Sequence, residues 1–307
     1  MRQPFLQPDS QARHPTPMPL PHISLLLTIC LLWAGNFLAA AFAVRAFEPM
    51  TFTALRFGLV LLLLLPFLRW PARGQWLRLI ACCWTMGAIH FGLVFFALER
   101  SSDLSSIALL MQIYIPLATV MAVLFLGERV GWRTAAGIVI AFGGVLVMGL
   151  DPLVLAQVDV LLLVLASALS LAIGTILMRG LKNIGVFSFQ AWNAALSLPL
   201  LVTAAIVIES PLGTLISPAE APIAWAAVGY SAIAASIIGH GGFYWLIQRH
   251  EVNQITPYLL LVPLFSVLLG VAVWGDRPGP RLLMGGGLIL TGVLWVTLRA
   301  RCRRRVR

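Results

Sequence analysis

Apolar residues in this 307-residue chain gather into ten runs, separated by short segments that carry charges, prolines or glycines. An α-helix that crosses the hydrocarbon core of a bilayer needs about 20 apolar residues. Because each run has roughly that length, the pattern predicts an all-α protein with ten membrane-spanning helices. The predicted spans are 23–44, 50–68, 76–98, 104–126, 133–150, 158–178, 186–208, 222–247, 255–274 and 281–299.

The composition agrees with this pattern. Hydrophobic residues make up 60% of the chain and charged residues only 10%, and the mean hydropathy is +0.94. A soluble protein is about a quarter charged, because its surface faces water. The chain is therefore a multi-pass membrane protein. Residues 1–22 are polar and rich in proline, and we expect them to form a disordered tail.

The net charge of +10 does not indicate nucleic-acid binding. Six arginines lie in the last nine residues, a basic tail over 300–307, and the others are scattered between the apolar runs. Such juxtamembrane charge binds anionic lipid headgroups. Sixteen Lys and Arg residues lie on the side of the two termini and four on the other side, with Arg56 inside a span. The positive-inside rule therefore predicts a bacterial inner-membrane protein with both termini in the cytoplasm.

The chain contains an internal repeat. A Gly-acid pair, an arginine and a glycine recur 148 residues apart, and each set follows a proline. The first set is Pro116, Gly127-Glu128, Arg133 and Gly137, and the second is Pro263, Gly275-Asp276, Arg281 and Gly285. We therefore expect two five-span halves, 23–150 and 158–299, joined by a periplasmic linker over 151–157.

An odd number of spans makes the second half enter the membrane from the opposite side. Inverted repeats around a midplane site are the architecture of secondary carriers. The repeat therefore favours a carrier that works by alternating access, with Pro116 and Pro263 as candidate bending points.

Several motifs resemble those of the drug/metabolite transporter superfamily. They are Trp33-Ala34-Gly35-Asn36-Phe37, Pro49 and Arg56-Phe57, with Pro116, Gly127-Glu128, Gly137 and Gly143-Gly144 fitting its EamA repeat. The resemblance covers about residues 23–299 and is strongest to YddG-type exporters of aromatic amino acids. It implies a ten-helix inner-membrane carrier, often an exporter of metabolites or amino acids. The second half departs from the pattern, since Asp276 replaces the usual Glu and span 7 has no arginine matching Arg56.

None of the eleven carboxylates lies in the middle of a predicted span. A proton-coupled exporter of cationic drugs typically needs a buried acid, and a phosphate or nucleotide-sugar carrier needs several buried basic groups. Only Arg56 is such a basic group. The pattern therefore favours a neutral or zwitterionic substrate.

Two histidines occupy the third span of each half, His90 in span 3 and His240 in span 8. One hypothesis makes each a ligand of a substrate carboxylate or hydroxyl, or a proton relay. The other makes each a hydrogen-bond donor to a neighbouring helix. Both hypotheses stay open at the level of sequence.

Four further residues are candidates for substrate binding. Trp33 and Asn36 share one face of span 1, and Tyr244 follows His240 by one turn in span 8. Tyr114 precedes Pro116 in span 4. Aromatic faces bind apolar or aromatic side chains, whereas helix packing is the structural alternative.

Arg56 lies about two turns inside span 2, counted from the predicted outer face. It either extends to the interface, pairs with an acid such as Glu48, or binds a substrate carboxylate. The first two roles are favoured, because the interface lies within side-chain reach.

These patterns predict a monomeric secondary transporter of neutral and aromatic amino acids or related small metabolites, without metal or cofactor. A multidrug or nucleotide-precursor exporter of the same fold is the first alternative, and a passive channel is another. A lipid-modifying membrane enzyme would need clustered Asp, Glu or His, and no cluster is visible. Glu128 and Asp276 are instead expected to cap the helices that follow them.

Overall fold

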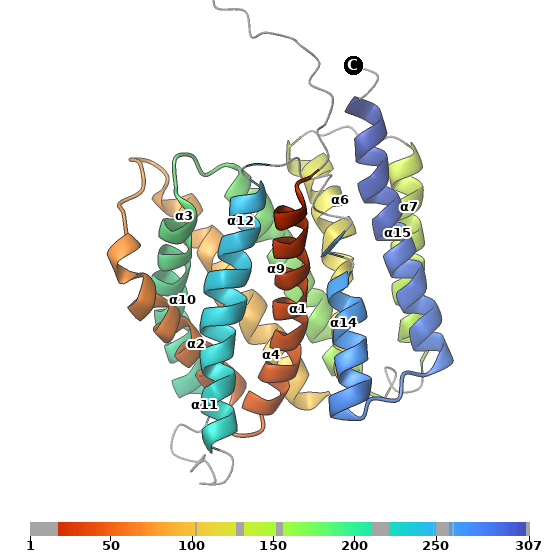
Figure 1. The fold of residues 1–307 in the computed structure, drawn as a ribbon, viewed down its shortest axis with the longest axis horizontal. Helices are drawn as coiled ribbons and strands as arrows, with labels where there is room; N and C mark the ends of the chain where they lie inside the picture. The colour runs from red at the N-terminus through yellow and green to blue at the C-terminus, as the bar shows by residue number, and fades with distance from the viewer. Residues whose placement is uncertain are drawn as a thin grey trace, which may run out of the picture.

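The computed structural model describes residues 18–101, 103–126, 132–151, 156–209, 221–247, 249, 258–259 and 261–304. This described part is a bundle of helices without β-strands (Figure 1). Seven helices in it are long and apolar enough to cross a membrane, and three shorter apolar helices accompany them. Together they form the ten spans that the hydrophobic pattern predicts.

The first half contains five spans. They are α1 (Leu20–Ala43); α2 (Pro49–Leu64) with the 3-10 turn η1 (Leu65–Phe67); α3 (Trp76–Cys83), η2 (Trp84–Ile89) and α4 (His90–Arg100); α5 (Leu104–Leu110), η3 (Met111–Ile113) and α6 (Tyr114–Leu126); and α7 (Trp132–Gly149).

The second half repeats this order. Its spans are α9 (Val158–Arg179); α10 (Val186–Ile208); α11 (Ala221–Gly229), η4 (Tyr230–His240) and α12 (Gly241–Ile247); α14 (Leu261–Leu269) with η5 (Gly270–Trp274); and α15 (Pro280–Arg304). The predicted beginning of span 9 and the Gly127-Glu128 pair lie outside the described residues. The last helix continues to Arg304, so most of the expected basic tail is helical.

Contacts between helices follow the inverted repeat. Corresponding spans pack on each other, α2 on α10 and α7 on α15. Spans 3 and 6 pack through α4 and α9, and their counterparts, spans 8 and 1, pack through η4 and α1. Likewise, α6 of span 4 packs on α9 of span 6, and their counterparts α14 of span 9 and α1 of span 1 pack on each other. An exchange of the two halves therefore maps these helix pairs onto one another, as a pseudo-twofold axis requires.

The glycines of the repeat make the contact between α7 and α15, which stand together at one edge of the bundle (Figure 1). A Cβ on Gly144 would lie 2.6 Å from the Gly285 carbonyl oxygen, and a Cβ on Gly285 equally close to the Gly144 carbonyl oxygen. One on Gly292 would lie 2.5 Å from the Gly137 carbonyl oxygen. Because small residues let helix backbones approach closely, these glycines hold the two repeats together.

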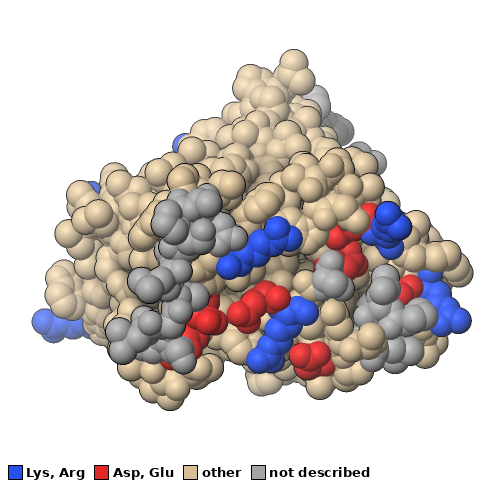
Figure 2. All heavy atoms as spheres, turned by 90° about the horizontal axis from the view of Figure 1, so that it is seen from below, with Lys and Arg blue, Asp and Glu red and all other residues tan. Residues whose placement is uncertain are grey.

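The first turn of α1 and the last turn of α15 lie at one end of the bundle. Seven carboxylates lie at the opposite end. We call this end the acidic face, and it carries Glu48, Glu99, Asp103, Asp151, Asp159, Glu209 and Asp276. Figure 2 shows carboxylates there interspersed with basic side chains. The other end, which carries the first turn of α1 and the last turn of α15, is the terminal face.

Asp276 does not cap the helix that follows it. Its carboxylate accepts hydrogen bonds from the backbone N–H of Ser105 (2.8 Å) and Leu104 (3.3 Å), at the beginning of α5. Gly275 has φ +83°, a left-handed turn just before this aspartate. The expected cap was wrong because the N-terminus of α5, with its unpaired N–H groups, lies nearer to the carboxylate than that of α15.

Other carboxylates of the acidic face also cap helices. Asp103 caps α5 beside Asp276, and burial raises the pKa of the Asp103 carboxyl to about 6. Glu209 of α10 accepts from the N–H of Met50 and of Thr51 at the beginning of α2. Since Asp276 and Glu209 belong to the second half and α5 and α2 to the first, these bonds connect the repeats at the acidic face.

The glycine contact predicts an effect on stability. Gly144→Leu forces α7 and α15 apart, and overpacking of this kind costs about 1–3 kcal/mol. We expect a lower thermal unfolding midpoint in detergent. Gly143→Leu is the matched control, because no atom lies within 4 Å of a Cβ at that position. Equal unfolding midpoints for the two variants would contradict the close contact.

Candidate functional site

Each half contains a π-helical segment in its third span. In span 3 the segment η2 ends at Ile89, directly before His90, and in span 8 the segment η4 ends at His240. A π-helix shifts the backbone hydrogen bonds by one residue, and such segments occur often at functional sites. The two histidines that the sequence paired thus lie at the C-terminal ends of two π-helical segments, His90 directly after η2 and His240 as the last residue of η4.

In span 8 the carbonyl of Ala235 accepts two side-chain bonds. The indole N–H of Trp33 donates at 3.2 Å, and Nδ1 of His240 lies at 2.8 Å. Because a carbonyl only accepts, the neutral His240 ring carries its proton on Nδ1 and keeps Nε2 as an acceptor. The structure gives that Nε2 no hydrogen-bond partner among the residues it describes. The rings of Trp33 and His240 lie 4.9 Å apart.

In span 3 the buried His90 bonds to the neighbouring helix α9. The hydroxyl of Ser167 donates to the carbonyl of His90 at 2.9 Å, and Nδ1 of His90 lies 2.8 Å from the same hydroxyl oxygen. Since the hydroxyl has one hydrogen, Nδ1 must be the donor in the second bond. His90 therefore makes the interhelical bond of the structural hypothesis, and its neutral ring also leaves Nε2 as an acceptor.

Arg56 lies in the interior with a side chain only 1% exposed. Its Nε and Nη2 donate to the hydroxyl of Ser236 in η4 at 3.0 and 2.9 Å, and its Cζ lies 4.0 Å from the centre of the Phe91 ring. Nη1 has no hydrogen-bond partner among the residues that the structure describes. None of the described carboxylates forms an ion pair with Arg56, so the guanidinium has no counter-ion in the part of the chain that the structure describes.

This placement contradicts both structural roles that the sequence favoured for Arg56. The side chain does not reach the interface, and it forms no ion pair with Glu48. The reason is the orientation of α2, which turns this position toward η4 and α4 and away from the acidic face.

Aromatic rings connect Arg56 with the other candidates. The Phe91 ring lies 6.4 Å from His240, and His240 lies 6.5 Å from Tyr244. Together with Trp33 and His90, these side chains form one cluster from α1, α2, spans 3 and 8. We call it the central cluster: Trp33, Arg56, His90, Phe91, Ser236, His240 and Tyr244.

The remaining predicted residues lie around this cluster. Tyr114 packs with Phe91 against the same apolar core. The amide oxygen of Asn36 is buried, and none of the described residues is its hydrogen-bond partner. Pro116 and Pro263 are buried in α6 and α14, and their spans contain the 3-10 turn η3 and the π-helical η5. Bending at these prolines stays a prediction.

Sequence reasoning missed two amides of α10. Gln190 is satisfied when its amide nitrogen faces the carbonyl of Ser236 (3.2 Å) and its oxygen faces the N–H of Gly241 (3.0 Å). The amide oxygen of Asn193 is buried and lies against Gly87 of η2, and no described residue forms a hydrogen bond with it. The signal was present, since both amides lie inside an apolar span.

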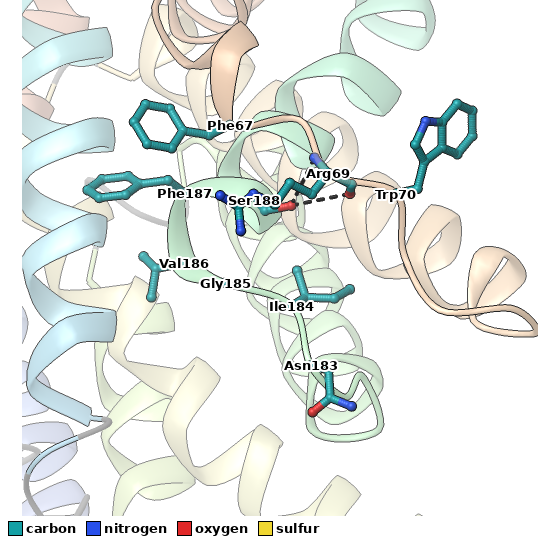
Figure 3. Close-up of a pocket in the computed structure, with 9 residues that line it drawn as sticks. All are labelled: Phe67, Arg69, Trp70, Asn183, Ile184, Gly185, Val186, Phe187 and Ser188. Atoms are coloured by element: carbon teal, nitrogen blue, oxygen red, sulfur yellow. Dashed lines mark hydrogen bonds between the residues drawn. The ribbon is translucent and has the colours of Figure 1, made fainter.

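A separate pocket opens at the terminal face between the end of α2 and the beginning of α10 (Figure 3). It has a volume of about 310 Å³ and is lined by Phe67, Arg69, Trp70, Asn183, Ile184, Gly185, Val186, Phe187 and Ser188. The rings of Phe67 and Phe187 lie 5.3 Å apart. None of the predicted site residues lines this pocket, so it is distinct from the central cluster.

Comparison with known proteins identifies the family. The sequence profile of the EamA-like transporter family matches residues 20–150 and again residues 160–298. The chain belongs to the EamA-like transporter family. The two matches give the two repeats of the fold, and the family makes the chain a transporter and not an enzyme.

Relatives of this EamA-like transporter include other transporters. A probable amino-acid metabolite efflux pump from Escherichia coli K12 is 26% identical over 88% of this chain and 92% of the pump. A probable terminal-alkyne amino-acid exporter from Streptantibioticus cattleyicolor is 26% identical over 76% of this chain and 77% of the exporter. A protein of known crystal structure, 21% identical, shares the fold with a TM-score of 0.63 over 92% of this chain and 99% of that one.

The packing of Trp33 in the EamA-like transporter gives a second prediction. A methyl group on Gly239 would lie 2.6 Å from the indole nitrogen of Trp33. Gly239→Ala should therefore displace the indole from the Ala235 carbonyl and lower the thermal unfolding midpoint, by about 1–3 kcal/mol in stability.

The control is Gly229→Ala in the same span, where no atom lies within 4 Å of a Cβ. That variant should keep or raise the midpoint, because alanine favours the helix over glycine. A destabilised Gly229→Ala with an unaffected Gly239→Ala would refute the Trp33 contact.

Proposed function

We propose that this EamA-like transporter exports amino acids, with neutral and aromatic amino acids as its main substrates. The names of the two relatives above support this class of substrate. The protein works as a monomer in the bacterial inner membrane with both termini in the cytoplasm, where the arginines of the terminal face contact anionic lipid headgroups.

The burial of Arg56 is the main support for this proposal. A guanidinium removed from water without a counter-ion is costly, and a partner that is absent from the chain itself is best supplied by the substrate. A carboxylate binds a guanidinium through charge-assisted hydrogen bonds, and Nη1 is the free donor. The substrate carboxylate therefore binds at Arg56.

The charge of Arg56 also bears on the alternatives. A cationic drug would meet a fixed positive charge in the middle of the membrane, which disfavours a multidrug exporter. A nucleotide precursor carries several phosphate charges, and the central cluster offers one guanidinium. A single carboxylate matches that charge best.

The aromatic part of the central cluster supports neutral and aromatic side chains. Trp33, His240 and Tyr244 each keep part of their surface exposed, and the His240 ring lies 4.9 Å from Trp33 and 6.5 Å from Tyr244. Such surfaces bury an apolar or aromatic substrate side chain. The Nε2 atoms of the two histidines are acceptors for a substrate N–H or hydroxyl.

Alternating access follows from the inverted repeats. The hydrogen bonds that Asp276 and Glu209 accept from the beginnings of α5 and α2 hold the two halves together at the acidic face. Opening that face to the periplasm breaks these bonds, and the two halves then rock about the central cluster. Substrate moves down its own gradient or with weak proton coupling through the histidines.

Counterflow in proteoliposomes tests the proposal. The vesicles are loaded with unlabelled amino acids, and the entry of labelled phenylalanine, methionine and threonine is followed. We expect saturable entry that internal amino acid accelerates, as a carrier requires. Protein-free vesicles are the control. Entry that does not saturate would indicate a channel, and no entry of any amino acid would refute the proposal.

A further inference from the structure

Asn193 occupies the position in α10 that Arg56 occupies in α2. The helix α2 begins at Pro49 and α10 at Val186, and the offset of 137 between these residues places Asn193 opposite Arg56 in the repeat. The two helices pack on each other. At the position in span 7 that corresponds to Arg56, the chain therefore has an amide instead of an arginine.

Both side chains face a π-helical segment of the other half. Arg56 donates to Ser236 of η4, and a Cβ on Gly87 of η2 would lie 2.7 Å from the amide oxygen of Asn193. The two residues therefore have equivalent surroundings on either side of the pseudo-twofold axis.

The unsatisfied atoms of this pair are complementary. Nη1 of Arg56 is a donor and the amide oxygen of Asn193 is an acceptor, and both are buried without a hydrogen-bond partner in the described part of the chain. A buried polar atom without a partner costs about 1–3 kcal/mol. The two side chains form no hydrogen bond with each other. A bound molecule that offers an acceptor to Nη1 and a donor to the amide oxygen would pair both atoms.

Two connections place the atoms near one another. Gly87 and Phe91 are four residues apart in span 3, and Asn193 lies against the first while the Arg56 guanidinium lies over the second. On α10, Gln190 lies one turn before Asn193 and bonds to Ser236, the residue that accepts from Arg56. The acceptor and the donor therefore lie against neighbouring turns of span 3.

We propose that the amide oxygen of Asn193 binds the α-ammonium group of the substrate whose carboxylate binds Arg56. This inference rests on the proposed function and adds the second half of the recognition. The two groups of an α-amino acid are attached to one carbon, so a single molecule reaches both residues. A neutral amide suits this role, because its oxygen accepts from the ammonium without placing a second charge in the interior.

Asn193→Leu tests the inference, since leucine has nearly the same shape and no acceptor. The structure gives the Asn193 side chain no hydrogen bond among the described residues, so the variant should keep or raise the thermal unfolding midpoint. We expect its KM for phenylalanine to rise about tenfold, which corresponds to about 1.4 kcal/mol. Inhibition of exchange by 3-phenylpropionate, which has the carboxylate but no ammonium, should be unchanged.

Thr203→Val on the same helix is the matched control, because Thr203 is exposed and its hydroxyl bonds only to the Pro199 carbonyl of its own helix. If Asn193→Leu does not reach the membrane, Asn193→Ala carries the test. An unchanged KM for phenylalanine overturns the inference, and so does an equal loss for both ligands with a lowered unfolding midpoint. Wild-type protein that exchanges no amino acid refutes the proposed function and this inference with it.

Discussion

The buried charge of Arg56 is the constraint on which the interior of this protein depends. The guanidinium is shielded from water and paired with no carboxylate among the described residues, so the surrounding helices must stabilise it by other means. The Ser236 hydroxyl accepts two of its hydrogen bonds, and the Phe91 ring adds a cation–π contact that is worth more where water is excluded. The remaining donor, Nη1, has no hydrogen-bond partner among the described residues, which is why we propose that it binds the substrate carboxylate.

The helix packing around Arg56 follows the symmetry of the repeat, whereas the polar side chains at the centre do not. The glycines of α7 and α15, the two π-helical segments and the histidines at their ends follow the inverted repeat. Symmetric packing lets the two halves exchange conformations at similar cost, as alternating access requires. The asymmetry of Arg56 and Asn193 gives the site a direction, and a zwitterion has a matching pair of unlike groups.

Hydrophobic length sets the spans, so the sequence predicted the ten helices and the two repeats. It did not predict the rotation of each helix, because lipid and protein interior are equally apolar and no polar stripe marks the inward face. For this reason the prediction that Arg56 extends to the interface or pairs with Glu48 was wrong. The prediction that Asp276 caps the following helix was wrong because the helix it caps depends on packing between the repeats. Nothing in the local sequence marks the π-helical segments, whereas the amide of Asn193 is visible inside span 7.

The most direct test of the account measures the thermal unfolding midpoint of the purified protein with L-phenylalanine and with phenethylamine, the same molecule without the carboxylate. A ligand that binds the folded protein raises this midpoint. If Arg56 binds the substrate carboxylate, the midpoint rises with phenylalanine alone in the wild type and with neither compound in Arg56→Met. An equal rise with phenethylamine, or a full rise with phenylalanine in Arg56→Met, would contradict the role of Arg56.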